Sequence, residues 1–452
     1  MSSRIFGYIR AIALATSFVL GFIVFLPLYE GSISSAAYAS VRLFFLYIDG
    51  HEITPLLDVA RWLAFFVMGS SVVSILAEKA GTSVVNFVKC FHPASTAIYG
   101  DTIYAKNLKK DIGWVAMLTT TVPIFRAKKH VIMLDNDKKS LDFYAKHRST
   151  FNEKSTTVIL DKVTSDCMHR KNLHVFSVTE SCAEEYWKNN IATGNEKIAI
   201  IGFGSLGQAI LEAGLLLNVV SLRQNIEYHI WGECTNYKGI HPQLFDSEGY
   251  LQCDKKDRVV FHNESWQCGL EREVGINRII LSETPNENLS NLSSILRLLC
   301  CERCTKIHVY TEDRIECFAD DRITHFGMAE TLFTKEIVLE EKLLENAKNL
   351  HKQYNKKGGQ EWDSLSAFMK RSNITASDYA FVINAHLKNL ELSELAELEH
   401  IRWCRFYFMH NFRYGEIKSE KLRTHNKLVP FENLPLEDKM GIEKHIHSLT
   451  GR

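Results

Sequence analysis

Uncharged, apolar stretches dominate the first 90 residues of the chain. Residues 11–28 form an apolar run of 18 residues without a charge, and residues 62–77 form a second run of 16. A helix needs about 20 apolar residues to cross a bilayer core, and polar flanking residues can reach the interface when the run is shorter. The pattern therefore predicts a membrane module over residues 1–90 with two membrane-spanning helices.

A third apolar segment, residues 36–48, lies between these two runs. It is interrupted by Arg42, and it is too short to cross a core of roughly 30 Å as a helix. We expect a short interfacial or re-entrant helix at this position.

Positive charges before the first run predict the orientation of the module. Arg4 and Arg10 precede the run, and Lys and Arg mark the cytoplasmic side of a membrane helix. Two spans return the chain to that side, so both termini of this multi-pass protein should be cytoplasmic. The alternative is a cleaved signal peptide, which the length of the first run and the presence of a second run both disfavour.

A strand, a glycine-rich turn and a helix follow one another near residue 200. Residues 197–201 are apolar and β-branched, residues 208–217 have helical spacing, and the turn between them is Gly202-Phe203-Gly204-Ser205-Leu206-Gly207. This is the G-x-G-x-x-G pattern of dinucleotide-binding turns in its proper context. The glycines permit a tight turn, close approach of a pyrophosphate and close packing of the helix, whose N-terminus offers N–H groups to phosphate.

Alternating strands and helices extend this unit into a Rossmann-like half over residues 193–330. Strands are expected at 227–231, 258–262, 278–281 and 306–310, a pattern typical of a parallel, doubly wound sheet. We predict NAD(P) or a related adenine nucleotide as cofactor, bound by Gly202, Phe203, Gly204, Ser205, Gly207 and Glu233. Glu233 lies further from Gly202 than the usual distance of about 20 residues, so an insertion around residues 218–224 must be assumed. The alternative is a glycine turn that only packs.

Residues 91–192 repeat this plan with fewer of its signals. Strands are expected at 96–99, 130–134, 156–160 and 173–178, with helices at 103–112 and 182–188. Only Gly100 of the glycine fingerprint is present, although Asp135 is well placed for a ribose. We expect a degenerate Rossmann-like half with a structural role.

Helical patterns continue beyond the second half. Apolar residues recur at helical spacing from 331 to 354, and Gly358-Gly359 follows, which predicts an amphipathic connecting helix over residues 331–357. It would pack on the second sheet or form a dimer contact. Residues 360–452 should form a further helical region.

Charge and cysteine content indicate which classes of partner and which cellular compartment to expect. Basic and acidic residues number 53 each and no basic stripe is visible, so no nucleic-acid partner is expected. The 11 cysteines are scattered, which fits a reduced compartment. Their only cluster, Cys300-Cys301-x-x-Cys304, lacks a second pair of ligands, so no metal is predicted.

The last quarter of the chain carries several separated anchors. They are His400-x-x-Trp403 on a polar helix, an Arg413-Tyr414-Gly415 turn, and Thr424-His425-x-x-Leu428-x-Pro430-Phe431. In order and spacing, residues 396–444 resemble the ryanodine receptor repeat (RyR) domain, a small helical module. The resemblance implies a bacterial sensor of nucleotide-derived ligands, with His400, Trp403, Arg413, Tyr414 and His425 as ligand contacts. The alternative for His400 is a packed, hydrogen-bonded core residue.

Tandem Rossmann-like halves behind two membrane spans resemble RCK-type regulators of potassium conductance, the cytoplasmic gating modules of many ion channels. Gly202, Gly204 and Gly207 match the nucleotide loop of that family, and the rest of the resemblance, over residues 95–330, is one of layout. The resemblance implies a homo-oligomer, a tetramer with a ring of halves. No Thr-Val-Gly-Tyr-Gly-like filter lies between the two runs, so potassium selectivity does not follow.

The sequence therefore predicts an α/β protein with two transmembrane helices, tandem RCK-like sheets and a C-terminal RyR-type domain. We expect a ligand-gated effector of the bacterial inner membrane, channel-like or membrane-perturbing, with the lipid bilayer and a small nucleotide-type ligand as partners. It should not be an enzyme, since the sequence has no catalytic motif. The resemblance implies a role in antiviral defence. The alternatives are a membrane-tethered NAD(P)-dependent oxidoreductase and a non-conducting, membrane-anchored adaptor.

Overall fold

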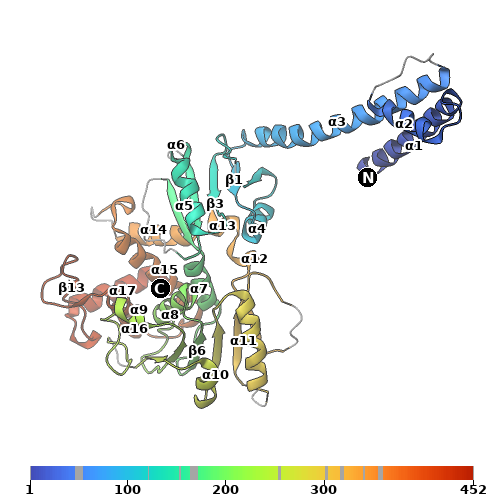
Figure 1. The fold of residues 1–452 in the computed structure, drawn as a ribbon. Coiled ribbons are helices and arrows are strands. Elements are labelled where there is room, and N and C mark those ends of the chain that lie inside the picture. Colours follow the sequence, from blue (N-terminus) through green and yellow to red (C-terminus); the bar gives the residue numbers. More distant parts are fainter. Residues whose placement is uncertain are drawn as a thin grey trace. The chain divides into compact units, whose positions relative to one another are not determined.

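The chain folds into two compact units, Met1–Phe91 and His92–Arg452. A computed structural model describes residues 2–45, 54–120, 122–151, 154–162, 172–252, 256–300, 304–315, 320–339, 342–354 and 360–450 (Figure 1). Each unit has a hydrophobic core of its own.

Helices make up the first unit. They are α1 (Ser2–Leu28), α2 (Ile33–Arg42), the 3-10 helix η1 (Leu43–Phe45) and α3 (Pro55–Lys89). Small residues line their contacts: Ala36, Ala39, Ala60 and Ala64 are buried, and the Ser17 hydroxyl donates to the Ala60 carbonyl at 2.7 Å. Small residues of this kind let apolar helices approach closely.

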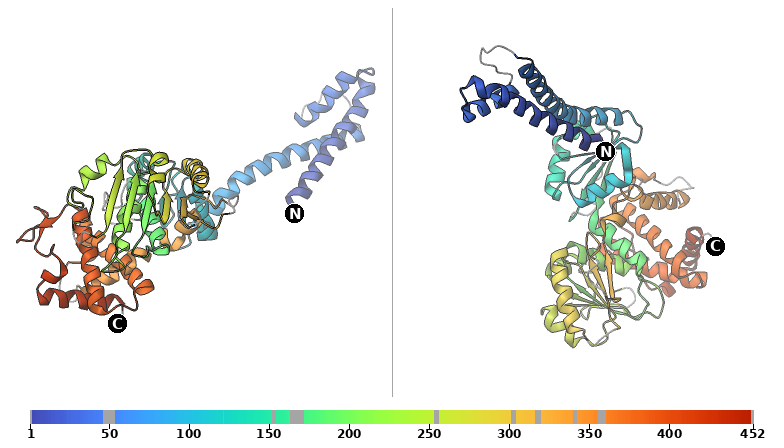
Figure 2. Two further views of the ribbon diagram at one scale, coloured as in Figure 1. Left: turned by 90° about the horizontal axis from the view of Figure 1, so that it is seen from below. Right: turned by 90° about the vertical axis from the view of Figure 1, so that its right-hand side faces the viewer.

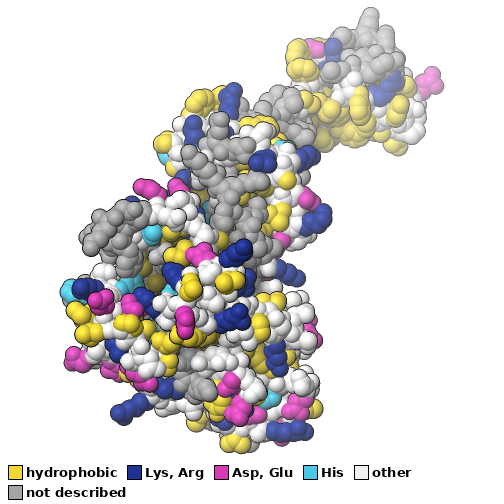
Figure 3. All heavy atoms as spheres, turned by 90° about the vertical axis from the view of Figure 1, so that its left-hand side faces the viewer, with side chains coloured by type: hydrophobic (Ala, Val, Ile, Leu, Met, Phe, Trp, Pro, Cys, Tyr) yellow, Lys and Arg dark blue, Asp and Glu magenta, His cyan; other side chains and the backbone are white. Residues whose placement is uncertain are grey.

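Two windows in this unit are long and apolar enough to cross a membrane, Ile9–Leu28 and Pro55–Val72. Large apolar side chains are exposed along both helices, and Figure 3 shows them gathered on this unit. The second helix begins at Pro55 and not at residue 62, because Thr54 caps it and proline suits the first helical turn. The predicted segment 36–48 is helical from Ile33 to Arg42, and its residues 46–48 lie outside the described part of the chain.

The first sheet of the second unit is parallel throughout. Its order is β2-β1-β3-β4-β5, with β1 (Thr96–Tyr99), β2 (Ala116–Thr119), β3 (Lys129–Ile132), β4 (Ser155–Leu160) and β5 (Leu173–Ser177). Its helices are α4 (Ile103–Ile112), α5 (Asp137–Lys146), α6 (Arg148–Phe151) and α7 (Val178–Asn189). The sheet is parallel as predicted, but the sequence did not predict strand β2.

The second sheet is parallel as well, in the order β11-β10-β9-β6-β7-β8. Its strands are β6 (Lys197–Ile201), β7 (Glu227–Trp231), β8 (Arg258–His262), β9 (Arg278–Leu281), β10 (Lys306–Tyr310) and β11 (Ile323–Phe326). Its helices are α8 (Ser205–Leu217), α9 (Thr235–Ile240), α10 (Trp266–Gly269) and α11 (Pro285–Leu298). Counted from β6, this is the strand order of a dinucleotide-binding doubly wound fold.

The single connecting helix predicted over residues 331–357 is wrong. The described chain forms three helices there: α12 (Ala329–Leu332), α13 (Lys335–Val338) and α14 (Lys342–Tyr354). Phe333 leaves helical geometry, and Thr334 starts α13 anew because its hydroxyl accepts the N–H of Ile337. The following residues 355–359 lie outside the described part of the chain.

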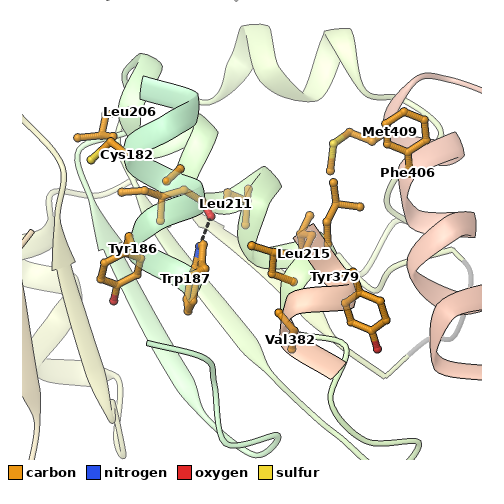
Figure 4. Close-up of a cluster of buried hydrophobic side chains, with 14 of the residues drawn as sticks. Cys182, Tyr186, Trp187, Leu206, Leu211, Leu215, Tyr379, Val382, Phe406 and Met409 are labelled. Carbon is orange, nitrogen blue, oxygen red and sulfur yellow. Dashed lines mark hydrogen bonds between the residues drawn. The ribbon is translucent and has the colours of Figure 1, made fainter. Parts of the chain in front are cut away.

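Three longer helices complete the unit: α15 (Ala367–His386), α16 (Leu392–Met409) and α17 (Leu436–Thr450), with β12 (Arg413–Tyr414) paired to β13 (Thr424–His425). Helix α11 covers one face of the second sheet, while α7, α8 and the C-terminal helices cover the other (Figure 2). Figure 4 shows side chains of α7, α8, α15 and α16 meeting in one cluster, where the Trp187 indole N–H donates to the Ile210 carbonyl at 2.7 Å. The C-terminal helices therefore share the core of the glycine-turn helix α8.

Candidate functional site

The glycine turn of the second half joins β6 to α8. Gly202 has a φ of +95°, which glycine adopts at little cost. Gly204 is the N-cap of α8, and no described side chain caps that helix end. A Cβ at Gly204 would have no described atom within 4 Å, whereas one at Gly207 would lie 2.0 Å from the Gly202 carbonyl oxygen. Gly204 thus leaves space for a ligand, and Gly207 lets α8 pack on the turn.

Phe203 contributes only its backbone to this turn. Its ring is buried and packs against Tyr237, with ring centroids 5.1 Å apart. Any contact of Phe203 with a cofactor would therefore come from its backbone, and the predicted contact stays a prediction.

Glu233 follows β7 and borders a cavity of about 390 Å³ with Gly202, Trp231 and His262. Its carboxylate accepts the backbone N–H of Thr235 at 2.8 Å. Hydrogen bonding by the Thr235 side chain, and next by this backbone N–H, lowers the pKa of Glu233. The predicted extra length between Gly202 and Glu233 lies in the loop after α8, which ends at Leu217. A carboxylate at this strand end is placed as a ribose acceptor would be.

A larger cleft of about 1080 Å³ lies between the two halves. The carboxyl ends of both sheets border it, since it is lined by residues 133–138 of the first half and by residues 204–206 and 282–285 of the second. Across it the Tyr104 and Tyr310 hydroxyls lie 3.2 Å apart. Ligands of open α/β sheets bind outside the carboxyl ends of the strands, so this is the position expected for a nucleotide.

The cleft is rich in acidic groups. Asp135, Asp137, Asp161, Glu283 and Glu312 line it, with Lys138 and Lys162 as the basic residues. The Glu283 side chain lies beside the glycine turn, where a Cβ on Gly202 would come within 2.6 Å of it. Burial, and to a lesser extent Glu287, raises the pKa of Glu283. A phosphate group would fit at the open N-terminus of α8 but must avoid this carboxylate.

A third cavity, of about 480 Å³, lies in the C-terminal helical region. Helix α16 supplies His400, Trp403 and Tyr407, and β13 supplies His425. The Trp403 ring lies 4.2 Å from that of Tyr407 and 4.9 Å from that of His425, centroid to centroid. Three of the five residues predicted to sense a ligand therefore meet in one aromatic wall.

Polar groups close the rest of this cavity. Lys418 and Lys427 line it, with Asp438 and His445 from α17. The Lys427 ammonium contacts the Asp438 carboxylate at 2.6 Å. Burial lowers the pKa of His425 and of His445 to about 4, so both rings are neutral near pH 7. The cavity combines ring faces, neutral imidazoles and two lysines.

His400 has both of the roles considered from the sequence. It lines the cavity, and its Nε2 contacts the Val429 carbonyl oxygen at 2.8 Å. Burial lowers its pKa, so the ring is neutral and donates this hydrogen bond from Nε2. A packed, hydrogen-bonded histidine thus forms part of the cavity wall.

Arg413 and Tyr414 lie outside this cavity. Both residues of β12 are exposed, and neither is among the described residues that line the cavity. Sequence reasoning missed Tyr407, although it lies four residues after Trp403 and so on the same helix face. The α17 residues could not be found from spacing, because the tertiary fold brings that helix to the site.

Helix α16 also faces the second half. The guanidinium of Arg405 contacts the Asp257 carboxylate at 2.7 Å and donates to the Leu215 carbonyl of α8 at 3.0 Å. Both side chains of the ion pair are fully buried. Asp257 in turn accepts the backbone N–H of Ile226 at 2.8 Å. One helix therefore connects the aromatic cavity to the helix that begins at the glycine turn.

No model of a protein family matches the chain, and no curated protein matches it. Two crystal structures of GsuK are similar to it. One, of a GsuK point mutant, is 13% identical, covers 76% of this chain and 100% of its own, and has a TM-score of 0.35. The other, of GsuK bound to ADP, is 11% identical and has a TM-score of 0.35, and its match covers 74% of this chain and 97% of the GsuK chain. A likeness this distant carries no argument about function, which rests on the geometry of this chain.

Proposed function

We propose that this chain is a membrane-bound effector controlled by two nucleotide-type ligands. One binds as an adenine nucleotide at the glycine turn, in the manner of RCK-type regulators. The other binds in the aromatic cavity of the RyR-like C-terminal region. The two apolar helices of the first unit anchor the chain in a membrane and respond to the ligand state.

The observation that carries this proposal is the buried connection through α16. His400 and Trp403 line the cavity from one face of the helix, while Arg405 binds Asp257 and the end of α8 from another. A ligand shifts a conformational equilibrium only through different affinities for the two states. A ligand that displaces α16 acts directly on α8, and hence on the glycine turn.

The chemistry of the aromatic cavity suits a nucleotide. The rings of Trp403 and Tyr407 offer faces on which a base can stack. Lys418 offers a cation for phosphate, and Lys427 offers a second one that is shared with Asp438. Neutral His425 and His445 supply hydrogen bonds without adding charge. The exposed Arg413 and Tyr414 would contact only a ligand that projects from the cavity.

A conducting form of this effector requires an oligomer. Two helices per chain cannot enclose an aqueous path, so a pore would lie on a symmetry axis, as in a tetramer. Both termini would lie in the bacterial cytoplasm, and a role in antiviral defence stays a prediction. Cysteines introduced at Ser34 and at Ser364 should be labelled from opposite sides of the membrane. Labelling of both from one side would contradict this topology.

Ion flux from liposomes that contain the full chain tests the proposal. Addition of a nucleotide from a panel that includes ADP and NAD should raise flux, and Trp403→Ala should abolish the response. Tyr414→Ala is the matched control, since it removes an aromatic ring outside the cavity and should leave most of the response. Ligand binding without flux would favour the adaptor, and turnover of NAD(P)H would favour the oxidoreductase.

A further inference from the structure

Two histidines and a glutamate converge on the second sheet, on the face opposite to α8. His229 of β7 and His262 of β8 face each other, with His229 Nδ1 3.0 Å from His262 Nε2. Glu273 follows the short helix η4 (Leu270–Arg272), and its carboxylate lies 3.7 Å from the same His229 Nδ1. The three ligand atoms lie within 4.8 Å of one another. Spacing along the chain does not reveal this cluster, because its members come from three separate elements.

These separations are close to those of a metal site. Bonds of 2.0–2.1 Å in a tetrahedral zinc centre place neighbouring donor atoms about 3.3 Å apart. The 3.0 and 3.7 Å distances from His229 Nδ1 lie on either side of that value. The Glu273 side chain is 28% exposed, so it can move the short distance that closes the site.

The surroundings hold the two imidazoles in place. The other nitrogen of His229, Nε2, lies 3.3 Å from the Glu227 carboxylate. A carboxylate in this position fixes the tautomer and leaves Nδ1 free to bind a metal. Trp231 stacks on the His262 ring, with centroids 4.1 Å apart and an interplanar angle of 5°. His262 also borders the 390 Å³ cavity beside Glu233, which gives an ion a route to the site.

We propose that His229, His262 and Glu273 bind one divalent transition-metal ion of the zinc class. Two imidazoles and one carboxylate are a ligand set for zinc and its neighbours, and not for magnesium or calcium, which take oxygen ligands. Three protein ligands leave a coordination position for water or for a donor atom of a bound ligand. Glu227 is the outer carboxylate of the site. The proposal is independent of the two nucleotide sites above.

The full chain in detergent, stripped of metal with a chelator, provides the test. Titration with Zn²⁺ should show one saturable site per chain. His262→Gln and Glu273→Gln should weaken this binding by at least about 100-fold, and Glu227→Gln by about 10–100-fold, the range for outer-shell partners. Glu264→Gln is the matched control, because Glu264 is a nearby carboxylate that pairs with Arg272 at 2.9 Å, and it should bind Zn²⁺ as the parent chain does.

Cobalt spectroscopy separates this site from the cysteines. Co²⁺ in the proposed site should show visible d–d bands without a thiolate charge-transfer band. A thiolate band, together with loss of binding in Cys304→Ser, would overturn the proposal, as would unchanged binding in His262→Gln. Absence of saturable binding in the parent chain would mean that the two rings only share a hydrogen bond. Metal-free Glu273→Gln should unfold at the temperature of the metal-free parent, which shows that its loss of binding is not a loss of fold.

Discussion

The two sheets begin with the same strand–turn–helix unit, but only the second leaves its helix N-terminus open. In the first, Thr102 caps α4, since its hydroxyl accepts the N–H of Ala105 at 3.2 Å. In the second, Gly204 occupies the corresponding N-cap, and no described side chain caps α8. A helix N-terminus attracts anions through its unbonded N–H groups. We therefore expect the residue at the cap, more than the topology, to decide which half binds a phosphate.

The glycines of the two turns differ in a related way. A Cβ at Gly100 would lie 2.2 Å from the Met133 carbonyl oxygen, so this glycine serves the contact between β1 and the segment after β3. In the second turn Gly207 has the packing role, and Gly204 is left open to a ligand. The first half therefore keeps the glycine that its fold needs and lacks the one that a pyrophosphate needs. The degenerate pocket predicted for this half stays a prediction until binding is measured.

The largest effect should come from the ion pairs of the two halves. Arg405–Asp257 is fully buried against the second half, whereas Lys139–Asp135 at the edge of the first is 58% and 69% exposed. Arg405→Ala leaves a buried carboxylate uncompensated and should lower the free energy of unfolding by about 3–5 kcal/mol. Lys139→Ala should not change the melting temperature. Denaturant unfolding measures both, and equal losses would show that Asp257 becomes hydrated.

A smaller loss should follow from a methyl group at the third glycine. In Gly207→Ala the new Cβ would meet the Gly202 carbonyl oxygen at 2.0 Å, and the forced separation of turn and helix should cost about 3 kcal/mol. Gly204→Ala adds the same methyl group to open space and should cost only about 1 kcal/mol, because alanine caps a helix less well than glycine. Thermal unfolding of the pair tests this division of roles. Similar stabilities for the two variants would contradict it.

Nucleotide binding should depend on the second turn alone. Gly204→Val places a side chain where a pyrophosphate would approach, so affinity for an adenine nucleotide should fall at least tenfold, or about 1.4 kcal/mol. Thr102→Val should cost about 1 kcal/mol of stability through loss of the α4 cap and leave that affinity unchanged. Calorimetric titration of both variants with an adenine nucleotide measures these affinities. Reduced affinity in Thr102→Val would mean that the first half contributes to binding.

The smallest effect concerns pH. His308 of β10 is buried, and neither ring nitrogen has a hydrogen-bond partner in the described part of the chain. Burial lowers its pKa to about 3, so between pH 8 and pH 6 only the unfolded chain takes up a proton. Stability should fall by about 0.8 kcal/mol over that interval from this residue alone, and His308→Leu should remove that part of the loss. A variant whose stability keeps the parent's pH dependence would refute this assignment.

The sequence predicted the sheets well where strands alternate with helices, and less well elsewhere. Strand β2 was not predicted. It has four residues and no helix lies between it and β3, so the sequence shows no βαβ pattern at this position. Strand β11 was not predicted either: it is an edge strand of four residues, of which only Ile323 and Phe326 are apolar. The helix predicted over residues 331–357 failed because its apolar spacing continues across the break at Phe333, where Thr334 restarts the helix.

The sequence also predicted only part of the aromatic cavity. His400 and Trp403 could be paired from their spacing on one helix, and the structure brings His425 to them. Asp438 and His445 reach the cavity only through the packing of α17 on α16. The partner of Arg405 is 148 residues away in the chain. Local sequence patterns therefore predict those residues of a site that share one helix. The residues that other elements contribute, and the contacts of the site with the rest of the fold, depend on tertiary structure.

Helix α3 has a mechanical consequence. Its 35 residues run without interruption from Pro55 to Lys89, a length of about 52 Å at 1.5 Å per residue. The apolar window Pro55–Val72 takes up about 27 Å of this, close to the thickness of a bilayer core. With that window in a membrane, the remainder would project from it as a stiff lever of about 25 Å. A tilt of roughly 10° of this helix in the bilayer would move its far end, at Lys89, by about 4 Å. A small rotation of the membrane window would therefore displace the start of the second unit, and a displacement there would tilt the window.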